Sequence, residues 1–114
     1  MVDVPLEAAR HTDDLIFVSG NGPVDPETGD IVSDDVAEQA VQTLENIRDV
    51  LDAEGATLDD VVKTTVFITD ESYYDDLNRG YAEVMGEPYP ARSCVVTDIV
   101  TEGQKVEIEA VAEK

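Results

Sequence analysis

The chain has 114 residues and a mass of 12.4 kDa, which is small for one domain but long enough to bury a real core. It carries 27 acidic against 7 basic residues, for a formal net charge of −20 at pH 7. A surface this negative repels the phosphates of nucleic acids and of anionic membranes, so we expect neither as a partner. One cysteine excludes an internal disulfide, and one histidine leaves no set of zinc ligands.

The acidic residues are spread along the whole chain and alternate with apolar positions, instead of forming a tail. This composition is typical of a folded protein from a high-salt cytoplasm, because at molar salt the Debye length falls to about 3 Å and charge repulsion is screened. The alternative is an ordinary acidic protein of low-salt origin. No apolar run approaches the roughly 18 residues of a membrane span, and no signal pattern opens the chain, so the sequence predicts a cytoplasmic protein.

The first elements are short strands and turns. The apolar run at residues 15–19 predicts a strand that ends at Gly20. Proline and glycine within residues 25–30 are turn chemistry, and they predict a hairpin between Val24 and residues 31–32.

A long helix follows this hairpin. Ser33 is a plausible N-cap, and it places Asp34 and Asp35 in the first turn, where the helix dipole favours anions. Apolar residues at three- and four-residue steps predict a helix that ends near Glu54, with Gly55 as its C′ residue. The apolar stripe consists of Val36, Ala40, Leu44, Ile47 and Leu51.

The second half alternates strands and a helix. Residues 61–68 are rich in β-branched side chains and predict a strand, and residues 72–85 predict a helix that ends at Gly86. Residues 92–97 and 106–112 predict the last two strands. The buried side of the second helix is expected to consist of Tyr74, Leu77, Tyr81, Val84 and Met85.

This order of elements predicts a single α+β domain over residues 1–114, with two helices on one face of one sheet. In the last strand Glu107, Glu109 and Val111 share the face opposite to its larger apolar set. A domain of this size cannot cover the second sheet face by itself. We therefore expect the chain to associate with copies of itself.

Arg92 is the first candidate functional residue. It follows Pro90 and Ala91 and precedes an apolar strand, so its side chain emerges near a strand end. A guanidinium there can bind a carboxylate with two parallel hydrogen bonds, which lysine cannot match. The alternative is a structural ion pair with one of the many acids of the chain.

Cys94 and two glutamates are further candidates. A nucleophilic cysteine needs a base, and because His11 is the only histidine and far away in sequence, we expect Cys94 to be a small buried hydrophobe. Glu107 and Glu109 lie on the same strand face. Either the face is solvated, or at least one of the two carboxylates moves protons to or from a water molecule.

Two other motifs are incomplete. The acid-rich residues 25–35 suggest a calcium loop, but Asp30 stands where the EF-hand needs glycine and Pro26 lies inside the loop. Gly20-Asn21-Gly22 follows a strand as a phosphate loop does, but no helix follows it directly. We expect both to be turns.

Four blocks together resemble one protein family, the RidA (YjgF-like) reactive-intermediate deaminases. The blocks occur in the family's order, and the resemblance extends from about Pro5 to Ala112. The matching blocks are residues 19–29, 62–67, 90–95 and 106–110.

The resemblance implies a chorismate-mutase-like α+β fold and a homotrimer whose sheets face an inner barrel. It implies hydrolysis of 2-imino acids, such as 2-iminobutanoate and 2-iminopropanoate, to 2-keto acids and ammonia, in clefts between subunits and without a cofactor. By the resemblance, Arg92 binds the substrate carboxylate, backbone groups at Cys94 face the imine nitrogen, and Glu107 positions and activates water. Further pocket-lining positions match Ser19, Gly20 and Asn78.

The chain departs from the family's pattern near its N-terminus. Leu6 stands where the family has a tyrosine that lines the pocket, and Asn21 replaces the usual glutamine. A second hypothesis is therefore a non-catalytic member that binds small metabolites as a regulator. A third, a ribonuclease or translation inhibitor, needs a basic patch that seven cations can hardly build.

Overall fold

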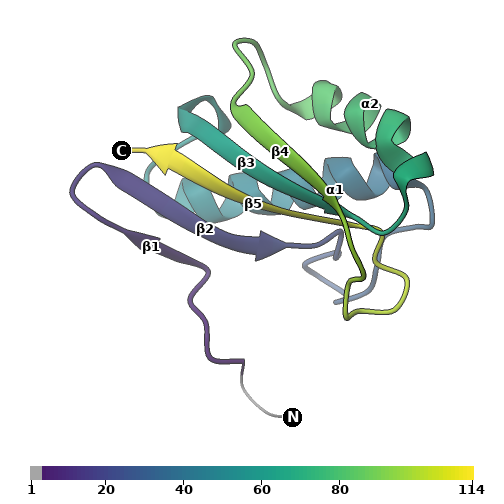
Figure 1. Ribbon diagram of the computed structural model, residues 1–114. Coiled ribbons are helices and arrows are strands. Elements are labelled where there is room, and N and C mark those ends of the chain that lie inside the picture. The colour runs from purple at the N-terminus through teal and green to yellow at the C-terminus, as the bar shows by residue number, and fades with distance from the viewer. Residues whose placement is uncertain (1–3) are drawn as a thin grey trace.

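The computed structural model describes residues 4–114, in which five strands form one mixed sheet and two α-helices cover one of its faces (Figure 1). The strand order in the sheet is β1-β2-β5-β3-β4. The predicted α+β class and the placement of both helices on one face are confirmed. In chain order the elements are β1 (Ala9–His11), β2 (Leu15–Asn21), α1 (Val36–Ala53), the 3-10 helix η1 (Leu58–Asp60), β3 (Val61–Ile68), the 3-10 helix η2 (Glu71–Tyr73), α2 (Tyr74–Val84), β4 (Ala91–Val96) and β5 (Val106–Glu113).

One crossover in this sheet is important for the site. The strands β3 and β4 are parallel, and α2 connects them across the covered face, whereas the other neighbouring strands are antiparallel. The register of the parallel pair sets Thr64 beside Arg92 and Val66 beside Cys94. Because paired residues of neighbouring strands point to the same face, all four side chains belong to the face that the helices cover.

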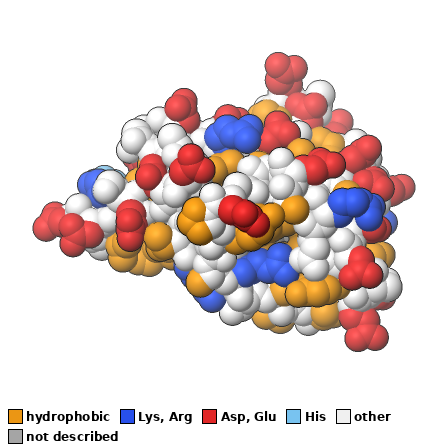
Figure 2. Space-filling view, turned by 90° about the horizontal axis from the view of Figure 1, so that it is seen from above, with side chains coloured by type: hydrophobic (Ala, Val, Ile, Leu, Met, Phe, Trp, Pro, Cys, Tyr) orange, Lys and Arg blue, Asp and Glu red, His pale blue; other side chains and the backbone are white. Residues whose placement is uncertain are grey.

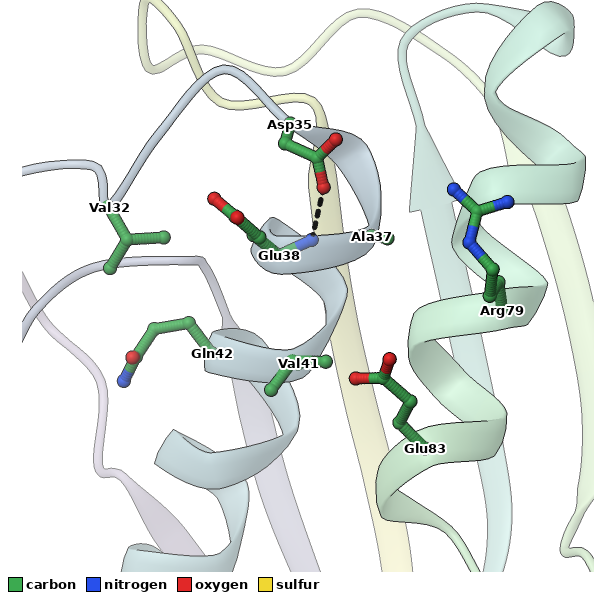
Figure 3. A pocket seen from close by; sticks show the side chains of 8 residues that line it. All are labelled: Val32, Asp35, Ala37, Glu38, Val41, Gln42, Arg79 and Glu83. Atoms are coloured by element: carbon green, nitrogen blue, oxygen red, sulfur yellow. Dashed lines mark hydrogen bonds between the residues drawn. The ribbon is translucent and has the colours of Figure 1, made fainter.

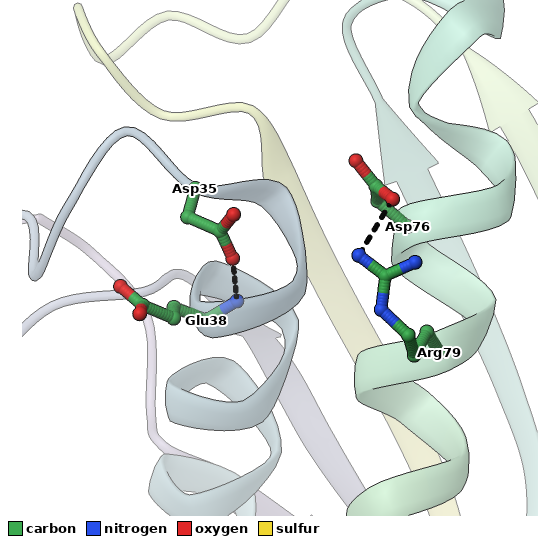
Figure 4. A network of polar contacts seen from close by, with 4 residues as sticks. All are labelled: Asp35, Glu38, Asp76 and Arg79. Atoms are coloured by element: carbon green, nitrogen blue, oxygen red, sulfur yellow. Dashed lines mark hydrogen bonds and ion pairs between the residues drawn. The ribbon is translucent and has the colours of Figure 1, made fainter.

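The helix α1 begins two residues later than the Ser33 cap predicts. Asp35 is the N-cap, and its Oδ2 accepts a hydrogen bond from the Glu38 N–H at 2.9 Å (Figure 4). Ser33 instead accepts from the Asp35 N–H and donates to the Glu38 carboxylate, so Asp34 lies before the helix and not in its first turn. Gly55 has a φ of +79°, the left-handed conformation of a C′ residue, as predicted.

The core lies between the helices and the covered sheet face. The predicted stripe of α1 is buried throughout, and Leu44, Ile47 and Leu51 are at most 1% exposed. Gly80 on α2 permits close helix packing, because a Cβ there would collide with the Ala37 carbonyl on α1. The buried apolar residues are Ile16, Val18, Val36, Ala40, Leu44, Ile47, Leu51, Ala56, Val61, Val66, Ile68, Leu77, Tyr81, Met85, Val106, Ile108, Ala110 and Ala112.

The structure differs from the sequence predictions in three details. The predicted hairpin between Val24 and residues 31–32 is present but short, with one antiparallel bridge between Val24 and Ile31. The helix predicted from Ser72 begins as a 3-10 turn, and Tyr74, expected on its buried side, is 44% exposed. The strand β1 has only three residues and was not predicted.

The other sheet face carries no helix among the described residues (Figure 1). Phe17 and Val95 are 46% and 43% exposed on it, and Glu107 and Val111 lie between them on β5. We call this the open face and the other the covered face. Neither α1 nor α2, nor any other helix in residues 4–114, has the length and hydrophobicity needed to cross a membrane.

Candidate functional site

Arg92 lies at the edge of the covered face, against the helix α2. Thr64, its neighbour on β3, has its hydroxyl 2.8 Å from the Tyr81 hydroxyl of α2. The guanidinium of Arg92 lies over the Tyr81 ring, 5.0 Å from the ring centre. Stacking on an aromatic ring restrains a planar cation and stabilises its charge.

Two polar groups of α2 hold the Arg92 guanidinium. Its Nη2 donates to Asn78 Oδ1 at 2.7 Å and to the Tyr74 hydroxyl at 3.1 Å. Asn78 lies one helical turn after Tyr74, so both reach the same point. The guanidinium therefore has a fixed orientation, and neither of these partners is charged.

Arg92 has no carboxylate partner in residues 4–114. The one ion pair found there joins Arg79 and Asp76, at 2.8 Å on the solvent side of α2 (Figure 4). The alternative that Arg92 serves a structural ion pair is therefore wrong for the described part of the chain. Within the same residues the side-chain hydrogen bonds of Arg92 all come from Nη2, and Nε and Nη1 make none.

A cavity of about 330 Å³ opens beside this guanidinium. Its lining is mostly apolar, and the turn before β4 contributes Tyr89 and Pro90 to it. A small cavity with one cation at its wall suits a ligand that has a carboxylate and a short apolar group. The lining residues are Asn78, Tyr81, Ala82, Tyr89, Pro90 and Arg92.

Glu107 lies on the open face, beside Phe67 of β3 and close to Gly20 of β2. A Cβ at Gly20 would lie 2.7 Å from Glu107 Oε2, so the glycine gives the carboxylate its space. Glu107 is half-buried, and Gln104 Nε2 is 3.4 Å from its Oε1. Glu109, two residues further along β5, is exposed. The structure thus distinguishes the two glutamates, which the strand pattern could not do.

Ser19 and Gly20 lie where β2 departs from regular pairing with β5. The register shifts between Val18 and Asn21, and Ser19 donates its hydroxyl hydrogen to the Glu7 carbonyl at 2.6 Å. The structure thus divides the six candidate site residues into two groups on opposite faces. Arg92, Cys94 and Asn78 belong to the covered face, and Glu107, Ser19 and Gly20 to the open face or its edge.

Cys94 has the surroundings of an inert thiol. It packs against the core, and this burial raises the pKa of the thiol, while the nearby Arg92 charge lowers it in part. His11 lies on β1, at the edge of the sheet opposite to β4. A nucleophilic Cys94 would therefore have no histidine base within its own chain.

Sequence reasoning missed two contacts of these groups. Tyr74 was expected in the core and instead binds Arg92, and Gln104 was not considered as a neighbour of Glu107. The four-residue spacing of Tyr74 and Asn78 could have indicated a shared helix face. The Tyr81 hydroxyl is buried against Thr64, and burial raises its pKa.

A larger groove of about 420 Å³ is lined by residues of α1 and α2, together with Val32 (Figure 3). Its polar groups are already used by the helices: Asp35 caps α1, and Arg79 binds Asp76 (Figure 4). Glu38 and Glu83 also line it, so a carboxylate ligand would be repelled. We do not assign a site to this groove.

The outer surface is as acidic as the composition predicts. Figure 2 shows acidic side chains spread over much of the visible face, with lysine and arginine in separate small patches. Such a surface offers no continuous basic track for a nucleic-acid backbone on this face.

Comparisons with known proteins place the chain in a family. The profile of the family described as Endoribonuclease L-PSP matches residues 4–114. The RutC family protein y4sK of Sinorhizobium fredii is 45% identical over 94% of this chain and 85% of its own length. The 2-iminobutanoate/2-iminopropanoate deaminase of Salmonella typhimurium is 42% identical over 86% of this chain and 78% of its own.

A solved structure agrees with the same assignment. The crystal structure of RidA from an Antarctic Psychrobacter superposes with a TM-score of 0.91 at 33% identity, covering 100% of this chain and 92% of the other. The agreement extends over the whole described fold. The chain therefore belongs to the Endoribonuclease L-PSP (YjgF/RidA) family.

Proposed function

We propose that the protein is a deaminase that hydrolyses 2-imino acids to 2-keto acids and ammonia. The observation that carries the proposal is the state of Arg92, a fixed guanidinium with no acidic partner in residues 4–114 of a chain that has 27 acids. A guanidinium that is held only by neutral groups in so acidic a protein is suited to bind the carboxylate of a ligand. Relatives named 2-iminobutanoate/2-iminopropanoate deaminase support the same chemistry.

The site requires more than one copy of the chain. Arg92 is on the covered face at the β4 edge, whereas Glu107 is on the open face of β5, two strands away. In one copy the sheet itself separates the two groups. The exposed apolar side chains of the open face provide a surface on which a second copy can pack. We propose a homotrimer in which each site takes Arg92 from one subunit and Glu107 from its neighbour.

The proposed roles follow from the chemistry of the imine. Arg92 binds the substrate carboxylate and so orients the C=N carbon toward Glu107. The Glu107 carboxylate accepts a proton from water as the water oxygen adds to that carbon. Glu107 returns that proton to the imine nitrogen, which gives the carbinolamine. Transfer of the carbinolamine hydroxyl proton to the same nitrogen, again through Glu107, then accompanies cleavage of the C–N bond, and ammonia and the 2-keto acid leave. Asn78 and Tyr74 keep the guanidinium in place, and backbone groups at Cys94 face the imine nitrogen, so the role of this cysteine is positional.

The family description names an endoribonuclease, but the surface charge argues against that activity here. A net charge of −20 with seven cations disfavours binding of RNA phosphates.

Leu6, which by the family resemblance stands in place of a pocket tyrosine, is 61% exposed. A non-catalytic member that binds metabolites would keep the Arg92 cavity and lack turnover, and the assay below separates the two.

The test generates 2-iminobutanoate from threonine with a threonine dehydratase and traps it with semicarbazide in molar salt. A deaminase suppresses the semicarbazone signal in proportion to added protein. Sedimentation in the same buffer is expected to give the mass of a trimer. A folded trimer that binds 2-ketobutanoate without suppressing the signal would overturn the enzymatic proposal and favour the metabolite-binding one, and a monomer would overturn the intersubunit site.

A further inference from the structure

Gln104 is a buried amide directly beside Glu107, outside the residues to which a role has been given. It is 8% exposed, its Nε2 donates to the Val106 carbonyl at 3.0 Å, and the same nitrogen is 3.4 Å from Glu107 Oε1. An amide NH₂ can only donate, and a carboxylate can only accept. The pair is therefore complementary in hydrogen bonding while Glu107 is ionised.

Glycines of β2 and the following turn leave room for this pair. A Cβ at Gly22 would lie 2.7 Å from Gln104 Nε2, and a Cβ at Gly20 would lie 2.7 Å from Glu107 Oε2. Neither glycine has a positive φ, so the backbone conformation does not require them. Glycine is needed at these two positions because a larger residue would fill the space that Gln104 and Glu107 occupy. This accounts for the Gly20-Asn21-Gly22 stretch that resembled a phosphate loop.

The loop that carries Gln104 is anchored on both sides of it. Gln39 of α1 is fully buried; its Nε2 donates to the Gly103 carbonyl at 3.0 Å and its Oε1 accepts from the Lys105 N–H at 2.8 Å. The two backbone groups that flank Gln104 are thus fixed to the first turns of α1. A side chain between two fixed backbone points has a well-defined origin from which to reach Glu107.

We propose that Gln104 is a positioning residue for the hydrolysis, holding Glu107 Oε1 so that Oε2 remains beside Gly20 to accept the proton of the attacking water. This inference rests on the proposed function. A carboxylate held at one oxygen loses rotational freedom, and its other oxygen keeps one direction toward the reacting water. The 3.4 Å contact belongs to the free protein, and such contacts commonly shorten when substrate binds.

Gln104→Met tests the donor, because methionine has a similar length and no N–H. We expect kcat to fall about 10-fold to 100-fold with KM unchanged, since misplacement of a reacting group slows the chemical step and leaves Arg92 to bind the substrate. Gly22→Ala displaces the same amide without altering Gln104, and should lower kcat in the same direction. In a Gln104→Ala background the added Cβ has space, so Gly22→Ala should then have no further effect.

Arg48→Met is the control, because it also replaces a polar side chain by methionine, but at an exposed position of α1 away from Gln104 and Gly22, and it should keep wild-type kcat. A wild-type protein without activity would contradict the proposed function. An active wild type, an inactive Glu107→Gln variant and unchanged kcat in Gly22→Ala or Gln104→Met would overturn only the role of Gln104. If Gln104→Met does not fold, Gly22→Ala decides alone. A rise in KM with kcat unchanged would also contradict positioning of Glu107.

Discussion

The two faces of the sheet are built from alternate residues of the same strands, yet they differ in chemistry. The covered face is apolar and carries one cation at its edge, Arg92, with neutral partners on α2. The open face carries a carboxylate, Glu107, set among exposed apolar side chains and beside a buried amide. The comparison teaches that the fold of one copy holds the two halves of the proposed site on opposite faces of the sheet, and in the proposed trimer a second copy brings them together.

Glu107→Gln is expected to cause the largest effect and breaks the open-face half of the site. Glutamine keeps the shape but cannot take a proton from water, so deaminase activity should fall by about 10² to 10⁴. Glu109→Gln is the matched control: it changes the same charge on the same strand face, two residues away and exposed, and should keep activity. The trapping assay measures both. Equal losses in the two variants would contradict a specific role for Glu107.

Arg92→Lys breaks the covered-face half. Lysine keeps the charge but not the planar pair of donors, so activity should fall about 100-fold, mainly through poor orientation of the substrate. Arg79→Lys is the control, because Arg79 forms an exposed ion pair that contributes at most about 1 kcal/mol. Titration with 2-ketobutanoate should show weaker binding for Arg92→Lys alone. Wild-type turnover and affinity in that variant would exclude Arg92 as the carboxylate-binding group.

The salt concentration should change the stability of the whole fold, and so of both sheet faces, because the protein has a net charge of −20. Because repulsion between unscreened carboxylates opposes the compact state, lowering salt from molar to about 0.1 M, where the Debye length is about 10 Å, should reduce the melting temperature markedly. Scanning calorimetry at neutral pH across a salt series measures this. An unchanged melting temperature would count against a high-salt origin.

Cys94→Ala should cause the smallest effect, below about 10-fold in kcat, because the proposed role of Cys94 is positional and the described chain places no histidine base near its thiol. Burial raises the pKa of the thiol, so the reactive thiolate is scarcer at neutral pH than in a free cysteine, and alkylation should accelerate only at correspondingly higher pH. Mass spectrometry after iodoacetamide treatment measures that rate. A folded but inactive Cys94→Ala variant would revive the cysteine nucleophile.

The covered face was largely predictable from sequence. The stripe of α1 repeats at helical steps over about four turns, and Gly55 marks the end of the helix, so local rules suffice. Its start was mistaken because Ser33 and Asp35 both have capping side chains, and the choice between them depends on Glu38. The strand β1 was missed because three residues show no periodicity, and their partner is supplied only by the fold.

The site was predictable as residues but not as an arrangement. A period of two sets Glu107 and Glu109 on one face and cannot distinguish them, whereas Gly20 and Gln104, across the sheet and in the preceding loop, do. Likewise, Arg92 contacts Asn78 because α2 connects the parallel strands β3 and β4 and packs beside β4. Both facts are tertiary, and no local pattern contains them.

Subunit mixing tests the central claim most directly, that each site takes its two halves from two copies. Arg92→Lys and Glu107→Gln proteins, each nearly inactive alone, would be dissociated, combined in equal amounts and reassembled, with mixed trimers verified by mass spectrometry. If Arg92 of one subunit meets Glu107 of its neighbour, random assembly restores about a quarter of the sites and of the wild-type activity. If the mixed trimers form and stay as inactive as their parents, the two residues do not combine across subunits and the account is wrong.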